Sequence, residues 1–198
     1  MVLSEAELAK ELRERKSDAI TQLYNTYVDR VYSLVYNQVD CDRDTAEEIV
    51  QETFYAAIKS ASSFQGRSGL LTWLCSIANN KVADHYRRKK RETDKKVMYA
   101  EYAQQNGHGH DVTTAVESME NVESVKKALS ALPLHYKQVL ILKYVEGFSL
   151  SDISQMMLRS QKSVEGLITR ARREMQDRLG VAGGEQMRDN AHPIRLMF

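Results

Sequence analysis

The sequence predicts an all-α protein made of two small helical domains joined by a flexible linker, with a helix-turn-helix in the second domain. Only 9 glycines and 2 prolines occur among 198 residues, which leaves little material for the many turns of an all-β protein. Apolar residues recur at steps of three and four over several stretches, as on one face of an α-helix. Residues 104–110 are polar, contain glycine and show no period, which is typical of a linker. We therefore expect a first domain over residues 1–92, a linker over 93–115, a second domain over 116–179 and a flexible tail over 180–198.

Three helices are expected in the first domain. The first begins at Asp18 and carries its apolar stripe as far as Val35. After a break at residues 40–43 a second helix with the same period follows, and the two can pair as an antiparallel hairpin. Residues 62–69 hold Ser, Gln and two Gly and indicate a loop. The third helix carries its stripe over residues 70–82 and runs directly into a basic segment.

The second domain shows the order of helices found in a helix-turn-helix. Two helices are expected over residues 116–132 and 134–145. Ser149 stands where an N-cap would, with Asp152 in the first turn, and so opens a short helix. A longer basic helix follows over residues 160–179. A short helix, a tight turn and a longer basic helix form the arrangement of DNA-binding helix-turn-helix domains.

The cysteines and histidines do not predict a metal site. Cys41 and Cys75 have no second Cys or His at the close spacing that zinc ligation uses, and both are interpreted as reduced thiols. His108 and His110 fall in the predicted linker and are interpreted as solvent-exposed. Residues 1–16 contain no uninterrupted apolar segment, so they predict neither a signal peptide nor a membrane span. We expect a cytoplasmic protein without a cofactor and without direct membrane insertion.

The net charge of +1 conceals a segregation of charge along the chain. Residues 1–60 carry 7 basic and 12 acidic side chains, whereas residues 61–91 carry 7 basic and 1 acidic. This pattern favours an acidic surface for a basic protein partner beside a basic surface for a polyanion.

The basic segment over residues 81–91 predicts a surface that handles single-stranded nucleic acid. It supplies six cations in eleven residues and includes His85 and Tyr86. Cations attract phosphates, and exposed aromatic rings can stack on unpaired bases. Basic residues also stabilise the C-terminal end of a helix through its dipole, which offers a structural explanation for two or three of them.

The last helix has one apolar side and one mixed polar side. Its polar side could face a DNA groove, because Arg presents two donors to guanine and Lys or Thr can contact phosphates or base edges. A solvated amphipathic helix is the alternative interpretation. The side chains expected to pack inward are Val164, Leu167, Ile168 and Ala171. Those on the polar side are Lys162, Ser163, Glu165, Gly166, Thr169, Arg170 and Arg173.

The second helix carries a polar face on the side away from Ile49, Val50 and Phe54. This face could bind a protein or could simply be hydrated, and the residues alone favour hydration. Its members are Asp44, Glu47, Glu48, Gln51, Glu52 and Tyr55.

Two ordered sets of motifs resemble the extracytoplasmic-function sigma factors of bacterial RNA polymerase. Residues 42–91, DRDTAEEIVQETFYAAIKSASSFQGRSGLLTWLCSIANNKVADHYRRKKR, are similar to the most recognisable stretch of that family. The motifs LP at 132–133, QVL at 138–140, EGFS at 146–149 and RAR at 170–172 are similar to its C-terminal helix-turn-helix domain. Together the matches cover residues 18–179.

The resemblance implies a role for each surface. The acidic helix, through Asp44, Glu47, Glu48, Gln51 and Glu52, would dock on the clamp helices of the largest polymerase subunit. The loop over 62–69 and the next helix would contact the minus-ten element, where Phe64 and Asn80 match positions at which relatives capture a flipped base. Trp73 would pack in the core. The melted strand would be held by its phosphates through Lys81, Arg87, Arg88, Lys89, Lys90 and Arg91.

The last helix would read the minus-35 element in the major groove. Here the chain departs from many relatives, because Glu165, Gly166 and Leu167 stand where they carry a basic residue, Ser and another basic residue. Glu can accept a hydrogen bond from cytosine but is repelled by phosphate. We therefore expect an altered promoter sequence, with contacts from Lys162, Thr169, Arg170 and Arg173.

The resulting interpretation is a sigma factor without enzymatic activity of its own, which directs core polymerase to specific promoters and assists their opening. The implied partners are the polymerase clamp helices and flap, promoter DNA and, in many relatives, an anti-sigma factor. One alternative is a free-standing helix-turn-helix regulator, which would leave residues 42–60 without a role. A second alternative is a metal-dependent nuclease using Glu47, Glu48 and Glu52, but no His or second acidic cluster accompanies them at helical spacing.

Overall fold

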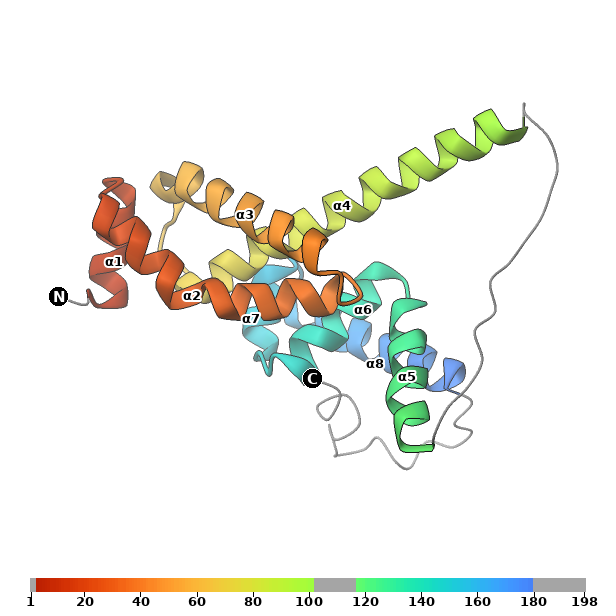
Figure 1. Ribbon diagram of the computed structural model, residues 1–198. Coiled ribbons are helices and arrows are strands. Elements are labelled where there is room, and N and C mark those ends of the chain that lie inside the picture. Colours follow the sequence, from red (N-terminus) through yellow and green to blue (C-terminus); the bar gives the residue numbers. More distant parts are fainter. Residues whose placement is uncertain (1–2, 102–116, 180–198) are drawn as a thin grey trace.

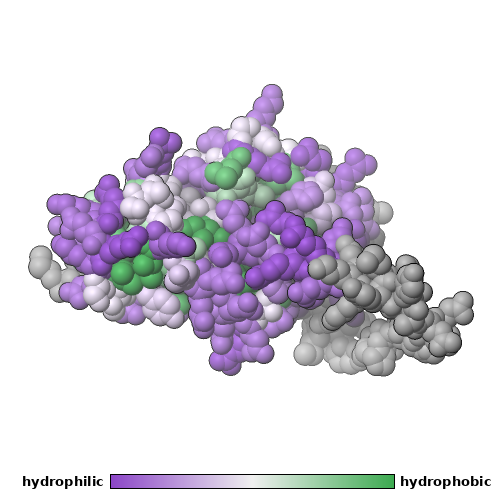
Figure 2. All heavy atoms as spheres, turned by 90° about the horizontal axis from the view of Figure 1, so that it is seen from above, coloured by the Kyte–Doolittle hydropathy of each residue, from purple (hydrophilic) through white to green (hydrophobic). Residues whose placement is uncertain are grey.

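A computed structural model describes residues 3–101 and 117–179, which form helices joined by short turns and loops (Figure 1). Within those residues there is no β-strand, so the predicted all-α class is confirmed. No helix in these two stretches is long and apolar enough to cross a membrane. Hydrophilic side chains cover most of the face in Figure 2, as expected when the apolar stripes of the helices are packed inward.

The first helical bundle contains α1 (Glu5–Arg13), α2 (Ser17–Gln38), α3 (Arg43–Ser60), the short 3-10 helix η1 (Ala61–Ser63) and α4 (Leu70–Glu101). The expected hairpin is formed by α2 and α3, and α4 packs against both of them. The turn of the hairpin passes through Asp40 and Cys41, whose φ angles are 59° and 62°. Leu23, Val31 and Ile49 belong to the common core.

Helix α1 was not expected from the sequence. It begins with a capping box, in which the Ser4 hydroxyl accepts from the Glu7 amide and the Glu7 carboxylate accepts from the Ser4 amide. Leu8, Ala9 and Leu12 bury its inner side in the first bundle. A nine-residue helix is too short for a clear hydrophobic period, and the capping box was the signal that could have revealed it.

Helix α4 extends further than expected. The predicted linker begins at residue 93, whereas α4 continues through Glu101. Residues 92–101 are mostly charged residues and good helix formers without an apolar stripe, so periodicity alone ended the helix too early. The rest of the predicted linker, residues 102–115, and the predicted flexible tail, residues 180–198, lie outside the described residues.

The second bundle contains α5 (Glu117–Ser130), α6 (Leu134–Leu140), the π-helical turn η2 (Ile141–Val145), α7 (Leu150–Met156) and α8 (Gln161–Arg178). The predicted capping box at Ser149 and Asp152 is present. Ser160 caps α8, because its hydroxyl accepts from the Ser163 amide at 3.2 Å. The order α7, turn and α8 confirms the predicted helix-turn-helix.

The two bundles pack against each other through apolar and polar contacts, and Leu34 of α2 and Cys75 of α4 belong to the hydrophobic core of the second bundle. The Gln38 amide donates to Asn79 Oδ1 at 2.7 Å, and the Gln138 amide donates to Gln38 Oε1 at 3.1 Å. Next to them the Lys137 ammonium, with 3% of its side chain exposed, lies 2.5 Å from Asp40 Oδ1. Buried hydrogen bonds therefore join the two bundles in this arrangement.

Candidate functional site

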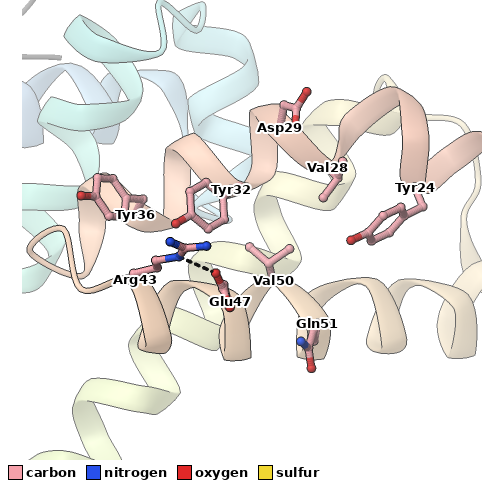
Figure 3. A pocket seen from close by; sticks show the side chains of 9 residues that line it. All are labelled: Tyr24, Val28, Asp29, Tyr32, Tyr36, Arg43, Glu47, Val50 and Gln51. Carbon is pink, nitrogen blue, oxygen red and sulfur yellow. Dashed lines mark hydrogen bonds and ion pairs between the residues drawn. The ribbon is translucent and has the colours of Figure 1, made fainter.

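A hollow between α2 and α3 lies beside the predicted protein-docking face (Figure 3). It has a volume of about 580 Å³, and we call it the α2–α3 hollow. Tyr32 and Tyr36 stack along one side with ring centroids 5.7 Å apart. The side chains that line it are Tyr24, Val28, Asp29, Tyr32, Tyr36, Arg43, Glu47, Val50 and Gln51.

The structure divides the predicted acidic set between two surfaces. Glu47 and Gln51 line the α2–α3 hollow, and the Arg43 guanidinium donates to Glu47 at 2.9 Å. Asp44 and Glu48 are exposed. Glu52 instead turns toward α4, where its carboxylate lies 3.1 Å from the Lys81 ammonium and 3.7 Å from the Arg88 guanidinium. The sequence analysis assigned Glu52 to polymerase and Lys81 and Arg88 to the melted DNA strand, whereas in the structure these side chains pair with each other.

The start of α3 holds the acidic face in register. Asp42 is the N-cap, and its carboxylate accepts from the backbone amide and the hydroxyl of Thr45. These hydrogen bonds lower the pKa of Asp42 below its ordinary value. The cap is thus charged at neutral pH, which suits the positive end of the helix.

The basic end of α4 is exposed, but one of its aromatic residues is not free to stack on bases. Arg87, Arg88, Lys89, Lys90 and Arg91 are all exposed. The Tyr86 hydroxyl instead donates to Asp40 Oδ2 at 2.9 Å, in the interface between the bundles. Burial and the nearby Asp40 charge raise the pKa of Tyr86. The expected stacking role of Tyr86 is therefore wrong for this arrangement of the bundles.

The predicted minus-ten loop faces α1 across a second hollow, of about 570 Å³, which we call the α1–loop hollow. Phe64 lines it but is only 7% exposed, because its ring packs against Trp73 with centroids 4.9 Å apart. Asn80 is exposed and is not part of the lining, so the two predicted base-capture residues do not share this hollow. The lining residues that sequence reasoning missed come mainly from α1 and are Glu5, Ala6, Ala9 and Arg13.

Helix α8 presents the two sides that its sequence predicts. Val164, Leu167, Ile168 and Ala171 are buried in the second core. The exposed residues are Lys162, Glu165, Thr169, Arg170 and Arg173, while Ser163 and Gly166 are half-buried. A β-carbon added at Gly166 would lie 3.4 Å from Arg170 Nη1. The Arg170 guanidinium therefore lies over the space that a longer side chain at position 166 would fill.

The described residues offer no resident metal site. They contain no group of three or more His, Cys, Asp or Glu side chains that could hold a metal ion. Cys75 is buried, and burial raises the pKa of its thiol to about 12. His108 and His110 lie outside the described residues.

Comparisons with known proteins match both bundles. The family model for sigma-70 region 2 matches residues 23–92, and that for sigma-70 region 4 matches residues 123–175. The chain is 30% identical over 176 residues to the ECF RNA polymerase sigma factor SigW of Bacillus subtilis (strain 168), covering 86% of this chain and 94% of SigW. It is 28% identical over 183 residues to the ECF RNA polymerase sigma-E factor of Haemophilus influenzae, covering 89% and 96% of the two chains.

Two solved structures share the fold. One is the sigma factor RpoE in complex with the anti-sigma factor NepR from Bartonella quintana, with a TM-score of 0.59, 23% identity, and coverage of 82% of this chain and 98% of RpoE. The other is CnrH in complex with the cytosolic domain of CnrY, with a TM-score of 0.63, 21% identity, and coverage of 90% and 99%. Helix α1 lies before the segment that the region 2 model matches.

Proposed function

Because the chain belongs to the extracytoplasmic-function sigma factors of the sigma-70 family, we propose that three of its surfaces divide the work of promoter recognition. The protein is an RNA polymerase sigma factor, and its family consists of initiation factors rather than enzymes. In this proposal residues 1–92 bind core polymerase and the minus-ten element, residues 116–179 bind the minus-35 element, and the protein itself catalyses no reaction.

Core polymerase docks on α3 and the α2–α3 hollow. The exposed Asp44 and Glu48 give this surface its negative charge, and Glu47 and Gln51 connect it to the aromatic lining. A basic helical segment, as in the clamp helices of the largest polymerase subunit, could lay apolar side chains into the hollow while its cations meet the carboxylates. Glu52 contributes less to this contact, because it already pairs with Lys81 and Arg88.

The exposed basic end of α4 holds the melted strand at the minus-ten element. Arg87, Arg88, Lys89, Lys90 and Arg91 are exposed and can neutralise phosphates, with Arg87 also paired to Asp84 and Arg88 to Glu52. Lys81 and Asn80 extend this surface toward the loop. Phe64 supports the loop from the core side, because its ring packs against Trp73 and is not free to contact a base.

Helix α8 reads the minus-35 element. Lys162, Thr169, Arg170 and Arg173 are exposed on the side opposite the core, as a recognition helix requires. Ser163, Glu165 and Gly166 lie among them and complete the face.

The second bundle also meets the polymerase flap, and the protein works in the cytoplasm. One structural neighbour is a complex with an anti-sigma factor, and the other is a complex with the cytosolic domain of CnrY. An anti-sigma factor therefore belongs among the partners proposed for this chain.

The observation that carries the docking proposal is the acidic rim of an aromatic hollow on α2 and α3. Glu48→Arg and Glu47→Arg should each lower binding to core polymerase at least tenfold, which is on the order of 1.4 kcal/mol. Glu14→Arg reverses an exposed charge elsewhere in the first bundle and serves as the control. Binding would be measured by fluorescence anisotropy of the labelled full-length chain. Equal losses in all three variants would point to a nonspecific charge effect and contradict the assigned surface.

A further inference from the structure

The carboxylate of Glu52 joins the proposed polymerase surface on α3 to the proposed DNA surface on α4. Its Oε2 atom accepts a hydrogen bond from the Lys81 ammonium at 3.1 Å, and its Oε1 atom lies 3.7 Å from the Arg88 guanidinium. Lys81 and Arg88 are seven residues apart on α4 and therefore share one face of that helix. Each oxygen of one carboxylate thus holds a different cation of the DNA surface.

The packing of α3 against α4 fixes the position of these charges (Figure 1). Thr53 and Val82, which follow Glu52 and Lys81 in the sequence, are completely buried. The backbones that carry the pair are therefore held by the core of the first bundle. The Glu52 and Lys81 side chains are 32% and 29% exposed, so water screens their attraction less than that of a fully exposed pair.

The two ion pairs limit what each surface can bind by itself. A phosphate that approaches Lys81 or Arg88 must compete with the Glu52 carboxylate, which also repels it. A basic polymerase side chain that approaches Glu52 must in turn displace one of the two cations. The contact with Arg88 is the weaker one, because 3.7 Å is longer than a hydrogen bond and half of the Arg88 side chain is exposed. Arg88 is therefore the cation that exchanges first.

We propose that Glu52 couples polymerase docking to binding of the melted strand by exchanging its ionic partners. In the isolated chain Glu52 holds Lys81 and Arg88. In the holoenzyme a basic side chain of polymerase takes their place, and the released cations bind phosphates of the strand. Whichever partner binds first breaks the pairs for the second, so each strengthens the binding of the other to the same extent. The inference rests on the proposed function, because it requires polymerase on α3 and DNA on α4.

The test compares the isolated full-length chain with holoenzyme reconstituted from the same chain. Both are titrated with the labelled non-template strand of a promoter from which the wild-type holoenzyme transcribes. Glu52→Gln should tighten strand binding by the isolated chain by about threefold to tenfold, since two weak ion pairs no longer compete with phosphates. The holoenzyme should change by less than about twofold, because its Glu52 has already left the cations. Core polymerase is the same in every sample, so its own DNA contacts cancel when variants are compared.

Asp84→Asn provides the matched control. Asp84 pairs with Arg87 within α4, so it also neutralises a cation of the DNA surface, but it does not lie on the polymerase-docking helix. Its replacement should tighten strand binding by the isolated chain and by the holoenzyme to the same extent. A gain confined to the isolated chain is therefore expected for Glu52→Gln and not for Asp84→Asn.

Arg88→Gln should give the converse result. The isolated chain should lose little affinity for the strand, because Glu52 already holds Arg88 there. The loss should be at least about threefold larger in the holoenzyme, where Arg88 is released. Lys90→Gln removes an exposed cation from the same helix and should weaken both forms alike. In Glu52→Gln the salt dependence of the isolated chain should also become steeper, by about 0.7 in the log–log slope for each added phosphate contact.

The ratio between the affinities of the isolated chain and the holoenzyme for the strand decides the inference. If Glu52→Gln changes both affinities equally, or changes neither, Glu52 does not couple the two partners. Equal losses in the two forms of Arg88→Gln would lead to the same conclusion. Each of these outcomes leaves the proposed function standing, because the strand comes from a promoter that the wild-type holoenzyme transcribes. If the wild type gives no promoter-dependent transcript from any template, the proposed function itself fails.

Discussion

Replacing Asp40 by asparagine should destabilise the packing of the two bundles, whereas replacing its buried partner Lys137 by methionine should not. The Lys137 side chain is 3% exposed and lies 2.5 Å from Asp40, whose side chain is 41% exposed. Removing one partner of a fully buried pair costs about 3–5 kcal/mol, because the remaining charge is buried alone. Asp40 faces water on one side, which lowers the expected loss to about 1–2 kcal/mol. Asparagine also tolerates the φ of 59° at this position, so the variant isolates the charge.

Lys137→Met should change the free energy of unfolding by between about 0 and 1 kcal/mol, in the stabilising direction. Burial lowers the pKa of Lys137 even though Asp40 favours its charged form, so burying the charge costs more than the pair returns. Asp40 would keep the hydroxyls of Tyr86 and Ser130 as donors. Urea unfolding at pH 7, followed by circular dichroism and by Trp73 fluorescence, measures both variants. If Lys137→Met lost as much free energy of unfolding as Asp40→Asn, the reasoning would be refuted. Glu174→Gln, which removes a surface pair with Arg178, provides the control.

Three further outcomes are expected. Burial raises the pKa of Asp40, but hydrogen bonds from Lys137 and Ser130 outweigh it and lower the pKa below its ordinary value. The contribution of Asp40 to the free energy of unfolding is therefore complete above the ordinary pKa of about 3.9 and is lost as the pH falls through the lower folded value. The loss of stability on acid titration should be shallower in Asp40→Asn. Gly166→Lys should displace the Arg170 guanidinium and change, by about tenfold, the preference at the base pair that Arg170→Ala also affects, whereas Gly166→Ala should be tolerated. Transcription from a promoter library randomised over the minus-35 element would measure the preference of each variant. Ser149→Ala removes the capping box of α7 and should cost about 1 kcal/mol in urea unfolding.

The helices of both bundles could be predicted from the sequence wherever an apolar stripe was long enough to repeat, and a capping motif located α7. Apolar residues at steps of three and four located α2, α3 and the start of α4, and Ser149 with Asp152 located α7. Charged helix formers without a stripe hid the end of α4, and the shortness of α1 hid that helix. Hydrophobic period reports a buried face, so a helix without such a face, or with too few turns to repeat it, gives no signal.

The partners of polar side chains could not be predicted, because helical period assigns a residue to a face but not to the neighbour that the face meets. Glu52 shares the polar face of α3 with Glu48, yet it pairs with Lys81 and Arg88 on α4. Tyr86 lies within the basic segment, yet its hydroxyl donates to Asp40 in the turn between α2 and α3. The Glu52 contacts join surfaces that the sequence assigned to different partners. Since Glu52 partly neutralises Lys81 and Arg88, binding at the acidic face and binding at the basic end of α4 share one carboxylate and cannot be energetically independent.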